Sequence, residues 1–139
     1  MANALYPIMK QAWLSGSADI SLNINTAQDG VFCQLSDTGV SAYSAAHDFY
    51  DDIVARIVGT SQRISTPTVV TGLFDGDNLT YTAVVGASVE ALDLYRHNAG
   101  ANTTWRLVAY IDTGQTGLPV TPNGGDITIT WDAAGIFQL

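Results

Sequence analysis

The chain has 139 residues, which is about the length of one domain and enough to bury its own core. Apolar residues make up 47% of it and charged residues only 13%, so the composition excludes disorder caused by high charge and low hydrophobicity. Thirteen acidic against five scattered basic side chains give a net charge of −8, and this balance argues against a nucleic-acid-binding protein. No apolar run approaches the roughly 20 residues of a membrane span, and we expect neither a membrane protein nor a cleaved secretion signal.

Residues 3–14 form the clearest helical pattern in the chain. Asn3 is a suitable N-cap, Pro7 falls in the first turn, where its missing N–H costs least, and Gly16 offers a left-handed C-terminal end. The apolar stripe of this helix has spacings of three and four and consists of Leu5, Ile8, Met9, Ala12 and Trp13. The stripe packs on a sheet or takes part in a subunit contact, and we favour packing on a sheet.

Period-two alternation predicts two strands at 19–25 and 31–35, which we expect to form a hairpin through the turn at 28–30. The second strand contains the single cysteine, Cys33, which we expect to be a buried small apolar residue. A short helix or turn is predicted over 44–53.

Further strands are predicted after this helix or turn. They are expected at 54–58, 64–71, 79–85, 89–95, 103–112 and 126–131, with a turn at 72–78. Pro67 suggests an edge position for its strand, because proline cannot donate to a neighbouring strand. The run 103–112 is apolar enough on both sides for both faces to be covered.

The C-terminal stretch has a strand with Ile127, Ile129 and Trp131 on one face, followed by Ile136, Phe137 and Leu139. An apolar end of this kind either closes the core of the domain or docks on a neighbouring subunit. Taken together, the elements predict a mainly β fold: an antiparallel β-sandwich or jelly-roll of about eight strands with one N-terminal α-helix, in a single domain spanning residues 1–139.

No catalytic or cofactor-binding motif stands out. The chain lacks a phosphate-binding glycine loop, a nucleophile elbow, zinc-ligand spacing and a dinucleotide fingerprint. His47 lies beside Asp48 and Asp51, but one histidine near carboxylates more often marks a solvated acidic surface than a metal site. The stretch 75–78 starts like a calcium loop, yet its twelfth position is Gly86 instead of glutamate, so a tight turn at Gly76 is the simpler interpretation. We therefore expect a protein that is not an enzyme and that has no cofactor.

Seven segments together resemble a group of small virion structural proteins of tailed bacteriophages. These segments are distributed over nearly the whole length of the chain and are residues 1–16, 35–39, 43–49, 80–92, 109–113, 117–132 and 136–139. The resemblance implies a component of the phage particle, assembled in the cytoplasm of the bacterial host, with the major capsid protein or other virion proteins as partners.

Within the particle, the acidic charge and the small β-domain favour a capsid cement or decoration protein that binds neighbouring capsid subunits from outside. A neck or tail subunit remains the alternative in the same class, and a host-glycan-binding module is the alternative of another class. We also expect a homo-oligomer, a dimer or a trimer. Six apolar residues near the two ends of the chain are the candidates for subunit contacts: Leu5, Met9, Trp13, Ile136, Phe137 and Leu139.

Overall fold

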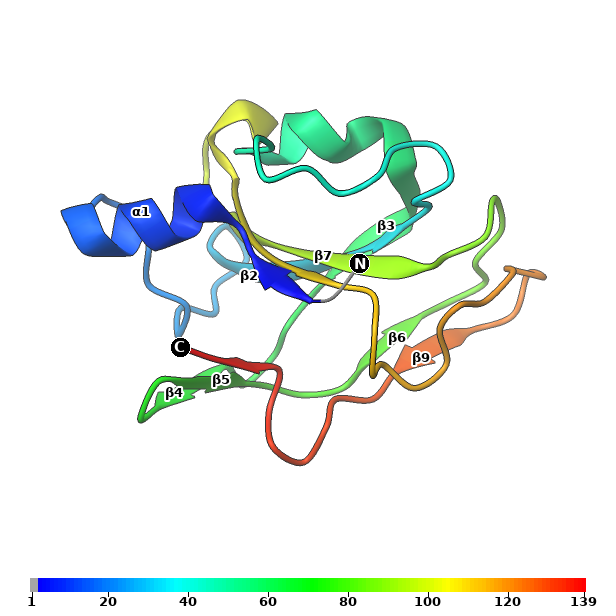
Figure 1. Cartoon of the computed structure of the whole chain (residues 1–139). Helices are drawn as coiled ribbons and strands as arrows, with labels where there is room; N and C mark the ends of the chain where they lie inside the picture. Colours follow the sequence, from blue (N-terminus) through cyan, green and yellow to red (C-terminus); the bar gives the residue numbers. More distant parts are fainter. Residues whose placement is uncertain (1–2) are drawn as a thin grey trace.

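A five-stranded antiparallel sheet forms one layer of the molecule (Figure 1). The computed structural model describes residues 3–139. In the order β1-β8-β7-β2-β3, the strands of this sheet are Ala4–Leu5, Arg106–Ile111, Ala91–His97, Gly30–Ser36 and Ile57–Arg63. This mainly β architecture with an N-terminal helix is the predicted fold class, although ten strands form instead of about eight.

Two smaller antiparallel sheets form the second layer, below the first in Figure 1. One has the order β10-β5-β4, with strands Phe137–Gln138, Leu73–Asp75 and Thr68–Val70. The other pairs β6 (Leu79–Tyr81) with β9 (Ile127–Ile129). Apolar side chains of both layers meet in an inner core that includes Leu35, Leu94 and Ile129, all fully buried.

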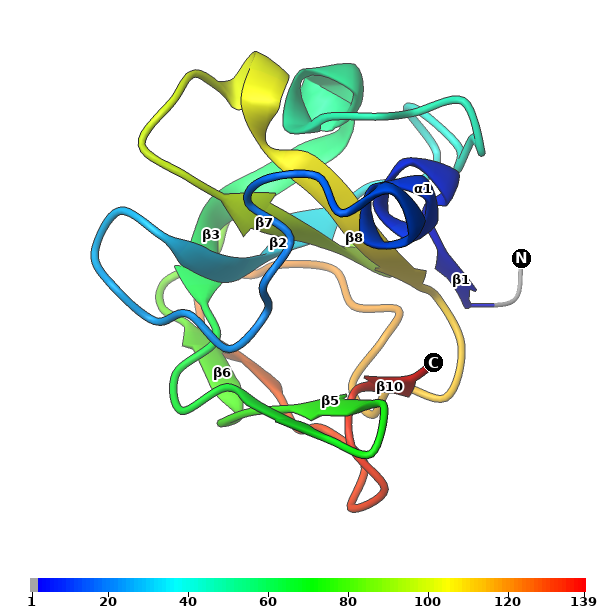
Figure 2. The same cartoon turned by 90° about the vertical axis from the view of Figure 1, so that its left-hand side faces the viewer.

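The outer face of the five-stranded sheet is covered as well (Figures 1 and 2). The two 3₁₀ helices η1 (Tyr50–Arg56) and η2 (Asn102–Thr104) lie over it, and α1 (Pro7–Ser15) runs beside β8. Strand β7 serves both sides by alternation: Leu92 and Leu94 enter the inner core, whereas Ala91 and Tyr95 join a second buried cluster under η1. The expectation that both faces of the 103–112 run are covered is likewise confirmed, with Val108 in the inner core and Leu107 in the outer cluster.

The predicted helix over 3–14 starts too early, because Ala4–Leu5 forms strand β1 and α1 begins at Pro7. Ala4 and Leu5 pair with Tyr110 and Ala109 of β8, which keeps the backbone extended up to Tyr6, the N-cap of α1. The side-chain oxygen of Asn3 accepts hydrogen bonds from the backbone N–H of Asp112 and Thr113 instead of capping the helix. The C-terminal end is as predicted: Gly16 has a φ of 63° and its N–H bonds to helix carbonyls.

The predicted strand at 19–25 is wrong. Only a single bridge, Asn25 with Gly30, pairs this segment with the start of β2. Side chains bind its carbonyl oxygens in place of a neighbouring strand: the indole of Trp13 donates to Ile20 and the guanidinium of Arg96 donates to Ser21. The alternating pattern thus reflects an irregular segment that buries Leu22.

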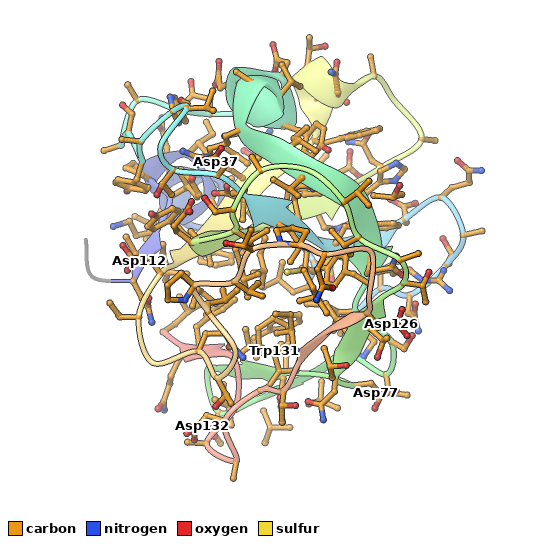
Figure 3. All side chains as sticks on the ribbon, turned by 90° about the vertical axis from the view of Figure 1, so that its right-hand side faces the viewer. Asp37, Asp77, Asp112, Asp126, Trp131 and Asp132 are labelled. Atoms are coloured by element: carbon orange, nitrogen blue, oxygen red, sulfur yellow. The ribbon has the colours of Figure 1, made fainter. Side chains whose placement is uncertain are left out.

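Several other boundaries differ from the prediction. The short helix occupies Tyr50–Arg56 instead of 44–53, and residues 72–78 contain strand β5 as well as a turn. Strand β6 ends at Tyr81, short of the predicted 79–85, because Ala83 has a φ of 51° that no strand residue adopts. The strand near the C-terminus is confirmed, and Trp131 lies buried beside it (Figure 3).

Candidate interaction surface

A seam between the two layers brings three of the six predicted contact residues together. Leu5 on β1 and Ile136 and Phe137 at β10 line a groove of about 260 Å³ between these two edge strands. All three are half-buried and pack against the inner core, and the ring of Phe137 lies 5.2 Å from that of Phe74. The C-terminal residues therefore close the side of the core and still reach the surface.

A second hollow, of about 420 Å³, is lined by residues of α1, the segment 20–23, β4 and the last residue of the chain. Its lining is mostly apolar and carries no charged side chain; it consists of Trp13, Ile20, Ser21, Leu22, Asn23, Val69 and Leu139. Leu139 is held there by the hydrogen bond from its N–H to the carbonyl of Gly72, at 3.0 Å, while 66% of its surface stays exposed. Leu14 and Val70, which follow the lining residues Trp13 and Val69 in the chain, are exposed as well. We call the hollow with these two residues the hairpin end.

Met9 is the predicted contact residue that the structure corrects. Its side chain is fully buried in the inner core, because the helix turns this position toward the sheets. A residue with no exposed surface is not available to a neighbouring subunit. The other five, Leu5, Trp13, Ile136, Phe137 and Leu139, line the seam or the hairpin end, and their role in a subunit contact stays a prediction.

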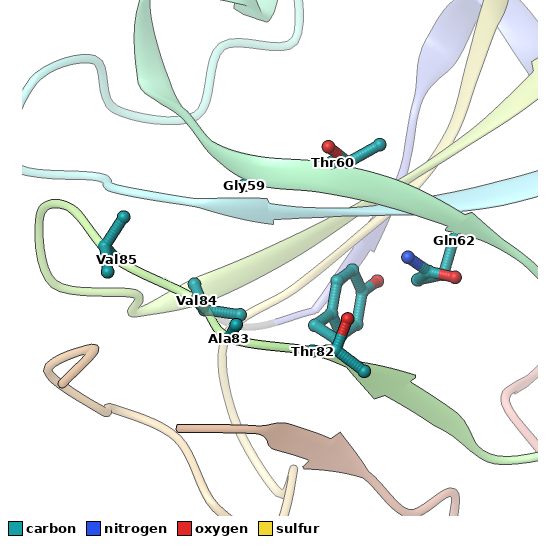
Figure 4. A pocket seen from close by; sticks show the side chains of 8 residues that line it. Gly59, Thr60, Gln62, Thr82, Ala83, Val84 and Val85 are labelled. Carbon is teal, nitrogen blue, oxygen red and sulfur yellow. The ribbon is translucent and has the colours of Figure 1, made fainter. Parts of the chain in front are cut away.

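An exposed apolar surface that sequence reasoning missed lies on the opposite side of the molecule. A hollow of about 150 Å³ there is lined by Val40, Val58, Val85 and Ala87, among others, and Val40 and Val85 are 62% and 69% exposed. Val85 also borders a groove of about 210 Å³ between β3 and β6 (Figure 4). We call the surface around Val40, Val85 and Ala87 the loop end. The sequence gives no sign of this surface, because Val40 lies between predicted elements and Val85 ends the predicted strand 79–85.

A fully buried ion pair between Arg56 and Asp93 lies under η1. The guanidinium of Arg56 donates to both carboxylate oxygens of Asp93, at 2.8 and 3.0 Å, and both side chains are fully buried. The hydroxyls of Tyr6 and Ser36 donate to the same carboxylate, at 2.6 and 2.7 Å, and Arg56 also donates to the carbonyl of Ser41. In the sequence, Arg56 is one of five scattered basic residues and Asp93 lies within the predicted strand 89–95.

This network resembles a catalytic cluster in composition but not in accessibility. Both carboxylate oxygens of Asp93 accept hydrogen bonds, and the side chains of Arg56 and Asp93 are fully buried. Burial, and then the neighbouring Asp93, raise the pKa of the Tyr6 hydroxyl far above its ordinary value, so this phenol stays protonated. Burial alone would lower the pKa of Arg56, but the charge of Asp93 outweighs it and raises that pKa. The cluster therefore holds η1, the loop before it and the start of α1 on the sheet.

The aromatic side chains are also engaged within the fold. The indole N–H groups of Trp13, Trp105 and Trp131 donate to main-chain carbonyls at 3.0 or 3.1 Å. The ring of Trp105 stacks on Tyr95 at 5.7 Å and lies 4.1 Å from the ring of His97. A sugar-binding platform needs a free aromatic face, and these contacts occupy much of the available ring surface.

The carboxylates on the side shown in Figure 3 are spread out instead of paired. Asp126 accepts a hydrogen bond from the N–H of Ala83, and Asp132 accepts one from Ala134, as in ordinary turns. Within residues 3–139, no three His, Cys, Asp or Glu side chains come together as a metal-binding group, and no helix is long and apolar enough to cross a bilayer.

Asn78, at the end of the suspected calcium loop, accepts a hydrogen bond from the N–H of Trp131. That loop therefore helps to hold the C-terminal strand in place.

No protein-family model matches the chain, and no curated protein sequence matches it.

Proposed function

We propose that the chain is a structural component of a tailed-bacteriophage particle, and that it acts as a cement protein bound to neighbouring subunits of the capsid. The structural observation that carries this proposal is the placement of exposed apolar side chains. Six of the seven large apolar side chains that are most exposed in residues 3–139 lie at the hairpin end or the loop end. Apolar surfaces gathered in this way are typical of proteins that bind other proteins.

The charge of the chain supports the same class of partner. With a net charge of −8, the surface repels the phosphate backbone of packaged DNA and favours a position outside the shell. No charged side chain lines the hairpin-end hollow, so its burial against a capsid subunit removes no side-chain charge from water.

A cement protein stabilises a shell by mass action. Because it binds the assembled lattice and not the free subunits, it lowers the free energy of the lattice by about 2.7 kcal/mol per site when its free concentration exceeds Kd about a hundredfold. Summed over many sites, this binding opposes the internal pressure of the DNA without any chemical step.

Electron cryomicroscopy of the particle that carries this chain tests the proposal. We expect density that fits the two-layered fold on the outer surface of the capsid shell. Density confined to the neck or the tail would replace the cement role with that of a neck or tail subunit. The absence of the chain from purified particles, checked by mass spectrometry, would refute the virion proposal altogether.

A binding assay separates the proposal from a host-glycan-binding module. Purified protein is mixed with expanded heads that lack it, with free capsid subunits, and with host surface polysaccharide. We expect co-sedimentation with the heads alone. Binding to the polysaccharide, with a shift in tryptophan fluorescence and no binding to heads, would favour the glycan-binding function.

A further inference from the structure

We infer that Asn123 is a site of spontaneous deamidation that the fold keeps unreactive, and that it reacts when one contact between two loops opens. The inference goes beyond the proposed function, because it concerns a covalent change of the purified chain and needs no partner. It rests on the sequence around Asn123, on the hydrogen bonds of Gly124 and Gly125, and on the exposure of this turn.

Deamidation of an asparagine joins its side chain to the nitrogen of the next residue. The main-chain nitrogen of Gly124 gives its proton to a solvent hydroxide ion and forms a bond to Cγ of Asn123. The bond from Cγ to Nδ2 breaks, and Nδ2 leaves as ammonia after taking a proton from water. Water then opens the resulting succinimide ring and leaves either aspartate or isoaspartate. Asn123 is the one asparagine in the sequence that a glycine follows, and a glycine has no Cβ to obstruct the attack.

The side-chain amide of Asn123 is already arranged for this attack. Its Oδ1 accepts a hydrogen bond from the N–H of Gly125, at 3.0 Å. Negative charge gathers on Oδ1 when a nitrogen attacks Cγ, and a main-chain donor at that oxygen stabilises the charge. Residues 123–126 are exposed, so solvent hydroxide and water reach the turn.

The attacking nitrogen, in contrast, is engaged in the fold. The N–H of Gly124 donates to the carbonyl of Val84 at 2.8 Å, and the N–H of Val84 donates to the carbonyl of Gly125 at 3.0 Å. The carboxylate of Asp126 accepts a third hydrogen bond, from the N–H of Ala83, at 3.0 Å. We call these three hydrogen bonds the loop contact, and Figure 4 shows Ala83 and Val84 on one side of it. The nitrogen of Gly124 turns to Cγ of the asparagine only after its own hydrogen bond is broken, so the loop contact opens before the reaction.

The reaction would change the loop end. Gly124 adjoins this surface, because a Cβ atom at Gly124 would lie 4.0 Å from Cγ1 of Val85, which is 69% exposed. A neutral amide becomes a carboxylate beside it, on a chain whose net charge is already −8. The loop contact therefore keeps a new charge away from an exposed apolar surface.

Peptide mapping by mass spectrometry measures deamidation of the full chain, kept in mildly alkaline buffer with and without guanidinium chloride. We expect Asn123 to react at least about tenfold more slowly in the folded than in the unfolded chain, since only the open fraction of the folded chain reacts. Asn98 is the control within the chain, because its Oδ1 also accepts a main-chain N–H, that of Gly100, but an alanine follows it. We expect Asn98 to react more slowly than Asn123 in the unfolded chain, because the Cβ of Ala99 obstructs the attack.

Asp126→Ala tests the loop contact, with Asp132→Ala as the matched control. Both aspartates are exposed, each accepts one main-chain N–H, and each substitution removes one negative charge, but Asp132 bonds to Ala134, outside the loop contact. We expect Asp126→Ala to raise the ratio of folded to unfolded rate at least about threefold, the effect of losing one hydrogen bond. Amide hydrogen exchange of Gly124 should rise by the same factor, because it needs the same opening. Asp132→Ala should leave both at wild-type values, at temperatures where thermal unfolding shows each variant to be folded.

The same measurements can overturn the inference. A folded wild-type chain that deamidates at Asn123 as fast as the unfolded chain would show that the fold does not protect the site. An unfolded chain in which Asn123 reacts no faster than Asn98 would remove the site itself. If Asp126→Ala and Asp132→Ala behave alike, or if hydrogen exchange at Gly124 rises without a rise in deamidation, the loop contact does not control the reaction.

Discussion

The two faces of the five-stranded sheet are packed in different ways. The inner face, toward the second layer, is covered by apolar side chains such as Val31, Leu92 and Leu94, and their burial depends on shape and area. The outer face buries the Arg56–Asp93 ion pair among tyrosines and under η1. Apolar side chains can pack in many arrangements, whereas a bidentate ion pair with two further hydroxyl donors requires one arrangement of its groups. The outer face thus fixes the position of its covering segments more narrowly than the inner face does.

Breaking the ion pair gives the largest expected effect on the outer face. Arg56→Met leaves the carboxylate of Asp93 buried without its charge partner, and we expect a loss of about 3–5 kcal/mol in the free energy of unfolding, measured by urea denaturation. The double variant Arg56→Met with Asp93→Leu should recover part of this loss. The remainder belongs to the hydroxyls of Tyr6 and Ser36, which then lack their acceptor. A single-variant loss below about 1 kcal/mol would show that the outer face depends on packing alone.

A large side chain on the inner face provides the comparison. Trp131 is 8% exposed in the inner core, and Trp131→Ala should cost about 3–5 kcal/mol in the free energy of unfolding, because a cavity remains. Unlike the ion pair, it has no second-site substitution that restores stability by removing a partner. A loss below about 1 kcal/mol together with weakened assembly would place Trp131 in an interface instead of the core.

Gly76 tests how tightly the second layer is packed below this core. A Cβ atom at this position would lie 2.3 Å from Cγ2 of Ile64 and 3.0 Å from the carbonyl oxygen of Ser65. Gly76→Ala should therefore cost about 1–3 kcal/mol through overpacking. In an Ile64→Ala background the same substitution should cost clearly less, since the clashing methyl group is gone, and the double-mutant cycle measures this coupling. Equal costs in both backgrounds would contradict the close approach.

The inner face was largely predictable from the sequence, and the outer face was not. Alternation in 31–35, 89–95 and 126–131 predicts the strands that line the inner core, because burial on one face imposes a period of two. Gly76 was interpreted as a turn residue, although the need for glycine there is a contact with a segment twelve residues away in the chain. Asp93 and Arg56 carry no local signal, since a buried ion pair is defined by two residues 37 positions apart.

The candidate contact residues show the same limit of prediction from the sequence. Periodicity identifies apolar positions on α1 and at the C-terminus, but it does not separate Met9, which is fully buried in the core, from Trp13, which lines the hairpin-end hollow. That distinction depends on which side of the helix β8 and the second layer occupy. Val85 ends the predicted strand 79–85 and Val40 belongs to no predicted element, so only the tertiary structure places them together.

Alkaline pH should lower the free energy of unfolding through groups on both faces of the five-stranded sheet, and by less than the substitutions above. Burial raises the pKa of Cys33 from its ordinary 9.0 to about 12, and burial raises the pKa of Tyr50 and of Tyr110 from 10.0 to about 12. A group whose pKa is higher in the folded than in the unfolded chain favours folding fully below its unfolded pKa. Stability should therefore be constant up to about pH 9 and then fall as the pH rises toward 12.

Urea midpoints measured between pH 7 and pH 11 test this expectation, with Cys33→Ala as the control that removes the thiol contribution on the inner face. A flat profile through pH 11 would show that these groups are not buried as the structure has them. Below pH 9, the neutral thiol of Cys33 should also resist alkylation in the folded protein, because its nucleophilic thiolate form is scarce and buried.

The smallest expected effect on stability distinguishes two residues that the sequence placed in one group of candidate contact residues. Leu139→Ser should change the free energy of unfolding by less than about 0.5 kcal/mol, because its side chain is 66% exposed in the monomer. Met9→Ala, in the fully buried member of the same predicted group, should cost about 2–5 kcal/mol. If Leu139→Ser lowers association without lowering monomer stability, its side chain belongs to a contact between molecules. A loss of stability near that of Met9→Ala would instead assign Leu139 to the closure of the inner core.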